Sequence, residues 1–365
     1  MNGICSEIFI SESTDPYDNL AMEELLMEFC QAEDPKNRSV ILFLWQNDNT
    51  IVIGRNQNVW EECSVSDFLA DGGRIARRKS GGGAVYHDTG NLNFSFIAPK
   101  DLYDISRQLG VIAKAVGSFG ISAEVSGRND LVIGEGDAAV RQSPSAGNAL
   151  SFVGRKFSGN AFYDNGKRKL HHGTILIDTN PAKISKYLTP NHRKLAKRSI
   201  RSAASRVVCL KEICADITGE KMKAAVINAF MEEYGQAGVK RIGAGLGAAG
   251  RKPVNEESGK AGPELIDAES GTAAPRLFRE FGRFSGFYAS PDWIFGAERG
   301  FDNTAELETD DGIISIHYSV CDGIITDAVI FTDSMDWECA EKMRGRVIGK
   351  MPGQLAGRKA DSLTD

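Results

Sequence analysis

Residues 77–96 of the chain read RRKSGGGAVYHDTGNLNFSF. The consecutive glycines Gly81 to Gly83 form a run of backbone without Cβ atoms, so their amide N–H groups can come close to an anion. Arg77, Arg78 and Lys79 stand directly before this run. A guanidinium group can bind a phosphate through two parallel hydrogen bonds, whereas an ammonium group acts as a point charge. Glycines and cations together predict an anion-binding loop.

The loop is followed by an alternating pattern. Leu92, Phe94 and Phe96 alternate with Asn93 and Ser95, which is the period of a half-buried strand. The loop is therefore expected to be attached to a sheet. The motif GxxxxGK[ST] of common nucleotide hydrolases and the dinucleotide motif GxGxxG are both absent from this block, so a nucleotide would have to be bound in another way.

Length, composition and charge narrow the class of protein. A chain of 365 residues is long enough for two domains, one with a full hydrophobic core. A formal net charge of −6 argues against a nucleic-acid-binding protein. We expect no membrane segment, because the start has no basic region and no stretch approaches the roughly 20 apolar residues of a membrane span. Seven scattered cysteines without a CxxC pair predict a reduced, cytoplasmic protein without structural zinc.

The remaining patterns predict a mixture of helices and strands. Asp15 and Pro16 are a typical start for a helix, and helices are also expected near 101–119, 181–188 and 220–234. Two hairpins are predicted: residues 39–54, interrupted by three polar residues, and residues 156–177, with an Asn-Gly turn. Three strands and a helix follow between about 305 and 348. The sequence unaided predicts only the α+β class.

The quoted block resembles the signature of lipoate–protein ligases, RRxSGGGxVxHDxGNLNxSF, within the larger group that includes biotin ligases and octanoyl transferases. DPYDNLAMEE, LFLWQND and IVIGRNQN, all N-terminal to the block, also resemble blocks of that family. The resemblance implies an α+β fold with a mixed, largely antiparallel, biotin/lipoate-ligase-like sheet. It implies a catalytic domain at 1–234, a flexible linker at 235–272 and a small C-terminal αβ domain at 273–365.

The resemblance also implies a reaction. Ligases of this family use ATP and Mg²⁺ to convert free lipoate to lipoyl-AMP and pyrophosphate. They then pass the lipoyl group to a lysine of apo lipoyl domains, as in 2-oxoacid dehydrogenase E2 subunits and the glycine cleavage H protein. Two alternatives remain: an octanoyl or lipoyl transferase that uses a cysteine nucleophile without ATP, and a non-catalytic lipoyl-domain binder.

The segment RKFSGNA is similar to the family's RKxSGxA, which implies that Lys156 is the catalytic lysine and contacts both ATP and lipoate. A fixed ammonium would offset the repulsion between a carboxylate and the α-phosphate. Without the resemblance, a lone lysine on a strand is usually only solvated. The family's other ATP-contacting positions correspond to Arg78, Gly83, Ala84, Val85 and Tyr86.

Further positions follow from the same resemblance. Lipoate is expected to contact Gly81, Gly82, His87 and His172 besides the lysine, with Trp45, Val85 and Ala161 as apolar walls. His171 and His172 cannot easily share a metal ion, because adjacent residues on a strand point to opposite faces.

Asn129 and Asp130 of the block GRNDL are the expected Mg²⁺ contacts, since Mg²⁺ prefers oxygen ligands. The residues alone are equally compatible with a polar turn.

Three segments and two cysteines complete the expectations. Residues 134–153 are an insertion relative to the family, with an undetermined role, and 189–206 form a basic run expected to close over the adenylate. The long linker at 235–272 is expected to free the small domain to swing. Cys209 and Cys214 are expected to be core thiols, which places the transferase second.

Overall fold

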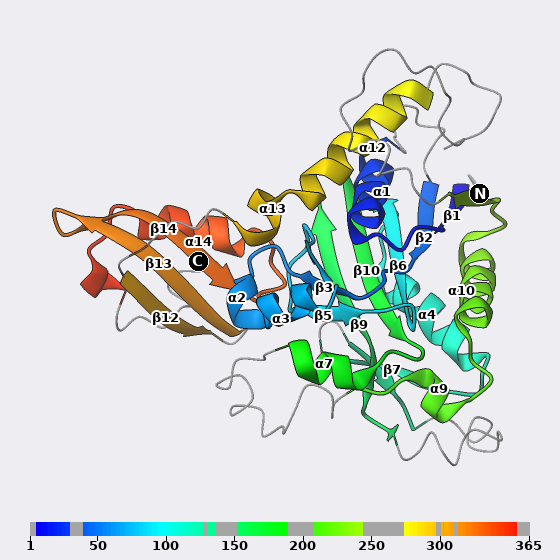
Figure 1. Cartoon of the computed structure of the whole chain (residues 1–365). Coiled ribbons are helices and arrows are strands. Elements are labelled where there is room, and N and C mark those ends of the chain that lie inside the picture. The colour runs from blue at the N-terminus through cyan, green and yellow to red at the C-terminus, as the bar shows by residue number, and fades with distance from the viewer. Residues whose placement is uncertain are drawn as a thin grey trace. The chain divides into compact units, whose positions relative to one another are not determined.

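The structure is a computed structural model of the whole chain (Figure 1). It describes residues 5–29, 39–127, 130–135, 152–188, 207–243, 274–296, 301, 303–309 and 312–355. The chain divides into two compact units, the first drawn from residues 1–50, 87–182 and 203–289, and the second from 51–86, 183–202 and 290–365.

The first unit is built on an eight-stranded sheet. In sheet order its strands are β11 (Val239–Ile242), β1 (Cys5–Ser11), β2 (Ser39–Trp45), β6 (Asn91–Pro99), β10 (Arg168–Leu176), β9 (Lys156–Asp164), β8 (Asp130–Ile133) and β7 (Ala123–Ser126). The pairs β11–β1 and β1–β2 are parallel, and every pair from β2 to β7 is antiparallel. This confirms the predicted α+β class with a mixed, largely antiparallel sheet.

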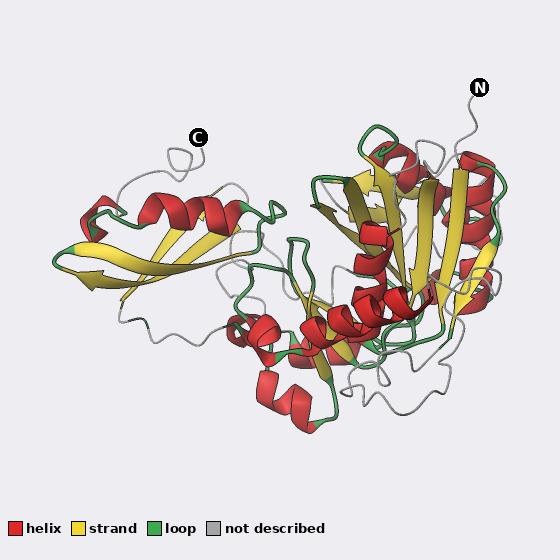
Figure 2. Ribbon diagram, turned by 90° about the horizontal axis from the view of Figure 1, so that it is seen from above, coloured by secondary structure: helices red, strands yellow, loops and turns green. Residues whose placement is uncertain are grey.

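The helices of this unit lie on both sides of the sheet (Figure 2). They are α1 (Pro16–Phe29), α4 (Ile105–Gly117), the short α9 (Leu210–Ile213), α10 (Gly219–Tyr234) and α12 (Ala274–Ala289), and α7 (Pro181–Tyr187) begins in it. The predicted cap of α1 is confirmed, because the Oδ1 of Asp15 accepts a hydrogen bond of 2.9 Å from the backbone N–H of Tyr17.

Alternation along the central strands distributes side chains between two faces. Leu42 on β2 and Phe94 on β6 belong to the main core, together with side chains of α4 and α10; we call this the core face. Trp45 and Ser95 point to the other side, where Ser95 bonds to Glu23 of α1; we call this the α1 face. Both faces of β2 and β6 are buried.

One predicted hairpin is confirmed and the other is wrong. β9 and β10 pair antiparallel, and the turn between them contains Gly166 at φ +90°, a conformation that favours glycine. The strands expected to form the first hairpin exist, but they lie in different sheets. β2 pairs with β1 and β6, so both of its edges are occupied and β3 (Thr50–Ile53) cannot pair with it.

The second unit contains two small sheets. One has the order β4 (Arg74–Arg77), β3, β5 (Val85–His87), and the other is an antiparallel meander of β12 (Asn303–Thr309), β13 (Gly312–Cys321) and β14 (Ile324–Thr332). Its helices are α2 (Val59–Glu62), α3 (Val65–Ala70), α13 (Pro291–Phe295), α14 (Cys339–Val347) and a 3₁₀ turn, Pro352–Gln354. The predicted three strands and final helix near the C-terminus are therefore present.

The unit boundaries are drawn differently from the predicted domains, which remain a prediction. β11 falls inside the stretch 235–272 that we predicted as a linker, and pairs with β1. α12 packs on α1: Ser285 donates a hydrogen bond to Asp18, and Tyr288 donates one to Glu24. None of the helices described here has the length and apolar composition required to cross a bilayer.

Candidate active site

Lys156 is the first residue of β9, and an ion pair fixes its side chain. Its Nζ lies 2.7 Å from Oδ1 of Asp130, the first residue of β8, and each side chain is about one-third exposed. The two atoms form no aligned hydrogen bond, so the contact is electrostatic. In the antiparallel pairing of β8 with β9, Asp130 lies opposite Gly159, and after a register shift Val132 lies opposite Lys156. The lysine side chain therefore reaches back over Gly159 to the carboxylate. The structure thus brings together two residues that were predicted separately, as catalytic lysine and metal contact.

A glycine makes room for the lysine. A Cβ on Gly159 would lie 2.7 Å from Nζ of Lys156, so the ammonium occupies the space above this glycine. The backbone N–H of Gly159 donates to Oγ1 of Thr174 at 3.1 Å. Thr174 and His172 share one face of β10, and His172 bonds to Glu23 of α1. The lysine head group therefore lies on the α1 face.

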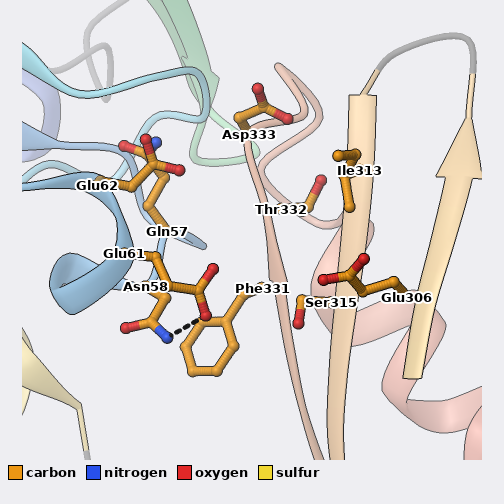
Figure 3. A pocket seen from close by; sticks show the side chains of 10 residues that line it. All are labelled: Gln57, Asn58, Glu61, Glu62, Glu306, Ile313, Ser315, Phe331, Thr332 and Asp333. Atoms are coloured by element: carbon orange, nitrogen blue, oxygen red, sulfur yellow. Dashed lines mark hydrogen bonds between the residues drawn. The ribbon is translucent and has the colours of Figure 1, made fainter. Parts of the chain in front are cut away.

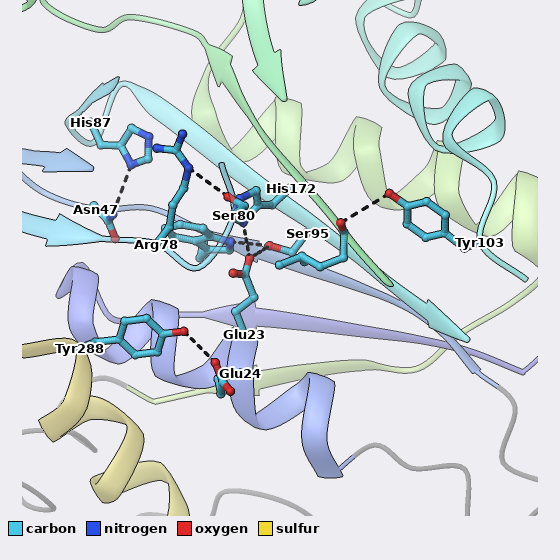
Figure 4. Close-up of polar contacts among 12 residues, drawn as sticks. Glu23, Glu24, Asn47, Arg78, Ser80, His87, Ser95, Tyr103, His172 and Tyr288 are labelled. Carbon is cyan, nitrogen blue, oxygen red and sulfur yellow. Dashed lines mark hydrogen bonds and ion pairs between the residues drawn. The ribbon is translucent and has the colours of Figure 1, made fainter. Parts of the chain in front are cut away.

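Polar and aromatic side chains form two rows on this face, and the rows cross the strands. Trp45, Asn93 and Thr174 are paired residues on β2, β6 and β10, and Phe43, Ser95 and His172 form the next row. The carboxylate Oε1 of Glu23 accepts from Oγ of Ser95 at 2.6 Å and contacts Nδ1 of His172 at 2.9 Å (Figure 4). Nε1 of Trp45 donates to the same hydroxyl at 2.9 Å. Glu23, Ser95, Asn93 and Thr174 were not among the predicted site residues.

The two adjacent histidines have different environments, as predicted. His171 lies on the core face, where its ring nitrogens are 2.9 Å from Gln108 and 3.0 Å from Asn160. Burial, with a smaller effect of His172, lowers the pKa of His171 to about 3. The ring is therefore neutral and has one donor and one acceptor. His171 is a core residue and cannot serve the α1 face.

His87 also belongs to the first unit. Its Nδ1 lies 3.2 Å from Nδ2 of Asn47 (Figure 4). Its ring meets that of Trp45 edge-on, with 6.1 Å between the ring centroids. The neighbouring Asp88 accepts from the backbone N–H of Gly90 at 3.0 Å. Two of the predicted lipoate contacts, His87 and His172, thus each have an intramolecular partner on a residue near the start of the chain.

The glycine loop belongs to the second unit and is held by that unit's own groups. Gly82 has φ +89°, and its N–H donates to the carbonyl oxygen of Ser334 at 3.0 Å. Arg78 is buried, and its guanidinium donates to Val52, Gly81 and Gly83 carbonyls at 2.7–3.1 Å and to Oγ of Ser80 at 3.0 Å. In this structure Arg78 fixes the shape of the loop.

Arg77 connects the loop to α13. Its guanidinium donates to the carbonyl oxygens of Trp293 and Ile294. It also donates to three carbonyls between Gly54 and Gln57 at 2.7–3.1 Å. Burial lowers the pKa of Arg77 to about 10, which leaves it charged at neutral pH. Arg77 and Arg78, two of the three cations before the glycines, therefore stabilise the structure of the second unit by bonding to its backbone carbonyls.

A pocket in the second unit does not coincide with the predicted site. It is lined by Gln57, Asn58, Glu61, Glu62, Glu306, Ile313, Ser315, Phe331, Thr332 and Asp333 (Figure 3). Four of these residues are acidic and none is basic. A triphosphate would be repelled there, so the pocket is no candidate for ATP.

The predicted metal contacts are only partly covered by the structure. Asn129 lies outside the described residues, as do most of the insertion, the basic run 189–206 and residues 244–273. Asp130 offers one carboxylate. Within the described ranges, no three His, Cys, Asp or Glu side chains gather as a metal-binding group. One carboxylate is compatible with Mg²⁺ that is otherwise held by phosphate and water.

The cysteines are free thiols in the described part of the chain. Burial, the largest cause, raises the pKa of Cys63 to about 12 and that of Cys209 to about 11. Cys209 directly precedes α9 and donates to the carbonyl of Thr179. A nucleophilic cysteine needs a lowered pKa. The raised pKa values of Cys63 and Cys209 therefore argue against a nucleophilic role for either thiol.

Solved structures share this fold. P. falciparum LipL1, solved in complex with lipoate, is 27% identical with a TM-score of 0.70, covering 93% of this chain and 88% of that one. The bipartite lipoate–protein ligase of Thermoplasma acidophilum, from work that also includes its E2 lipoyl domain, is 22% identical with a TM-score of 0.58, covering 82% and 100%. A lipoate–protein ligase A bound with ATP is 21% identical with a TM-score of 0.56, covering 80% and 99%. The fold is that of lipoate–protein ligases.

The sequence supports the same conclusion independently. The family described as the lipoyl protein ligase A/B catalytic domain matches residues 15–231, which is more than half of the chain. The protein belongs to this family. The matched range contains the glycine block and the strands that carry Asp130, Lys156 and His172.

Proposed function

We propose that the protein is an ATP-dependent lipoate–protein ligase that forms lipoyl-AMP and transfers the lipoyl group to a lysine of apo lipoyl domains. The observation that carries the proposal is the Lys156 ammonium, held 2.7 Å from Asp130 on the α1 face of the sheet. The family contains both A and B types, so family membership alone does not decide between ligase and transferase. The lysine favours the ligase, because a fixed cation is what the approach of two anions requires.

In the first half-reaction, a carboxylate oxygen of lipoate attacks the α-phosphorus of ATP. A P–O bond forms, the bond to the β-phosphate oxygen breaks, and pyrophosphate leaves. Lys156 would contact the carboxylate and an α-phosphate oxygen at once, and so reduce their repulsion. Asp130 would hold Mg²⁺ together with the phosphates, and the ion would neutralise phosphate charge.

In the second half-reaction, the neutral ε-amine of the acceptor lysine attacks the carbonyl carbon of the mixed anhydride. The new C–N bond replaces the C–O bond to AMP, and the amine loses a proton. Glu23, Ser95 and Trp45 would keep His172 in place beside the acyl group. Support for the substrate and acceptor comes from relatives: one was solved with lipoate, and another was studied with its E2 lipoyl domain. The H protein is a second acceptor in this proposal.

The glycine loop would bind the nucleotide. Gly83, Ala84, Val85 and Tyr86 would supply backbone contacts, with Gly81 and Gly82 approaching the acyl phosphate. Arg78 would act mainly by fixing the loop, since its donors are bonded to the loop's own carbonyls. A relative of the same fold was solved with ATP.

The test is carboxylate-dependent exchange of labelled pyrophosphate into ATP, comparing lipoate, octanoate and biotin with Mg²⁺ present. Exchange with lipoate or octanoate is expected. Well-folded protein that gives no exchange with any acid, but transfers an acyl group from a carrier protein, would replace the ligase by the transferase.

A further inference from the structure

The α1 face contains a buried side-chain amide whose N–H donor has no partner in the described part of the chain. Asn93 of β6 is 1% exposed. Its Oδ1 accepts a hydrogen bond of 2.8 Å from Nδ2 of Asn91. Its Nδ2 is shielded from solvent and has no acceptor among the residues that the structure describes. A buried donor without an acceptor is costly to a protein, and a ligand atom can remove that cost.

Asn93 lies on the same face of the sheet as the ammonium of Lys156, and in the same row of residues across the strands. Asn93 pairs with Thr174 on β10, and Thr174 accepts from the backbone of Gly159 on β9, above which the Lys156 ammonium lies. Asn93 and the ammonium therefore stand in one row on one face, two strand spacings apart, or about 10 Å between backbones. Two hydrogen bonds of about 2.8 Å on either side of a carboxylate bridge most of this separation.

We propose that Asn93 is a substrate-binding residue whose Nδ2 donates a hydrogen bond to the carboxylate of the acyl substrate, on the side opposite Lys156. This inference rests on the proposed function and names a specificity contact within it. A saturated or dithiolane-bearing fatty acid has strong acceptors only at its carboxylate, so a donor buried among Trp45 and Thr174 can be satisfied nowhere else on such a substrate. The shielded position strengthens the bond, because no water competes for it.

The experiment uses the full-length protein and two probes, lipoate and its neutral amide. Binding of each is measured by calorimetry, and pyrophosphate exchange is measured with lipoate. Asn93→Ala is expected to weaken lipoate binding roughly 10–100-fold, the range for a hydrogen bond to a charged group, and to weaken amide binding less. Asn93→Asp keeps the shape but sets a carboxylate against the substrate carboxylate. It should therefore bind the amide more tightly than lipoate, the reverse of the wild type.

The matched control is Gln108→Ala. Gln108 is also a fully buried amide whose Nε2 has no partner in the described part of the chain, but it lies at His171 on the core face. Its loss should lower the thermal midpoint without changing the ratio of lipoate to amide affinity. If Asn93→Ala fails to fold, Asn93→Ser shortens the side chain while keeping it polar, and the same ratio is measured.

Wild-type exchange together with unchanged affinity ratios in folded Asn93 variants would overturn this inference and leave the proposed function intact. Wild-type protein that binds lipoate and its amide, shows the shifted ratios in the variants, but gives no exchange would overturn only the proposed function. A wild type that binds no acid would overturn both.

Discussion

The ammonium of Lys156 and Oδ1 of Asp130 lie 2.7 Å apart, at the starts of two adjacent antiparallel strands. Both side chains are about one-third exposed, but Oδ1 of Asp130 is shielded from solvent, so a bound ligand would meet the exposed part of each side chain. A phosphate that enters there would attract the ammonium, and a divalent cation would compete with it for the carboxylate. In the proposed mechanism, the pair would therefore link the position of the lysine to metal and nucleotide binding.

Asp130→Asn is expected to raise the Mg²⁺ concentration needed for half-maximal pyrophosphate exchange on the order of tenfold, because a neutral amide is a weaker ligand than a carboxylate. The measurement is exchange rate against Mg²⁺ at saturating ATP and lipoate. Asp178→Asn is the control, since Asp178 pairs with Lys211 at an exposed position. An unchanged Mg²⁺ requirement in Asp130→Asn would contradict a metal-binding role.

Lys156→Ala should abolish adenylate formation while the fold survives, since the side chain is partly exposed and belongs to no hydrophobic cluster. Exchange and the thermal midpoint are measured together. Lys211→Ala, which removes the other half of the exposed pair with Asp178, should leave exchange unchanged. Full exchange activity in Lys156→Ala would refute the assignment.

Gly159→Ala should slow the exchange reaction roughly 10–100-fold without destabilising the protein. The new Cβ would lie 2.7 Å from Nζ and 2.9 Å from Cε of Lys156. These atoms are the flexible end of a side chain, so the ammonium moves and the backbone does not. Gly110→Ala on α4 is the control, because among the described residues no atom outside the neighbouring helix backbone lies within 4 Å of its new Cβ. It should keep full activity and gain up to about 1 kcal/mol of helix stability. Equal exchange rates in the two variants would show that the position of the ammonium does not matter.

His171 should make stability depend on pH below about 6.5. Its folded pKa of about 3 is below the ordinary value of 6.5, so the unfolded chain binds the extra proton first. The stabilising contribution is complete above pH 6.5 and is lost as the pH falls toward 3. Between pH 8 and pH 5 this amounts to about 2 kcal/mol. Urea unfolding of the wild type and of His171→Gln at pH 8 and pH 5 measures this difference in the free energy of unfolding. An equal loss of unfolding free energy in the two proteins would contradict a neutral buried imidazole.

Cys209→Ala is expected to retain both half-reactions. With its pKa raised to about 11, the thiol is protonated at neutral pH and is a poor nucleophile. Alkylation by iodoacetamide should therefore be slow at pH 7.5, and faster after unfolding. The same is expected of Cys63. Loss of acyl transfer in a folded Cys209→Ala protein would instead favour the transferase.

Local chemistry made several elements predictable. The Asn-Gly turn of the β9–β10 hairpin requires a positive φ that Gly166 supplies, and Asp15 before Pro16 is a helix start that depends on neighbouring residues alone. The opposite environments of His171 and His172 followed from the two-residue period of a strand. The biotin/lipoate-ligase-like topology came from resemblance, since periodicity does not order strands in a sheet.

Long-range partners were not predictable from the residues. Glu23 lies on α1, and its partners Ser95 and His172 are 72 and 149 residues away. Asn93 was read as the polar position of a half-buried strand, but the structure buries both faces of β6. The residue types on this face could have predicted its burial. Asn91, Asn93 and Ser95 are short and uncharged, and such residues are more typical of a covered polar face than of a solvated one. Likewise, the uninterrupted apolar run SVILFLW indicated a central strand and not half of an isolated hairpin.

The bonds from Arg77 to Trp293 and Ile294, and from Gly82 to Ser334, have a genetic consequence. All the sequence motifs of the family around the glycine block are encoded before residue 100, but the carbonyl groups that hold this block are encoded more than 200 codons later. A nonsense mutation near codon 290 would leave the glycine block, Asp130, Lys156 and His172 translated, and would still remove the carbonyl groups that support the loop. Such an allele should lose the function of the loop although it changes none of the loop's residues.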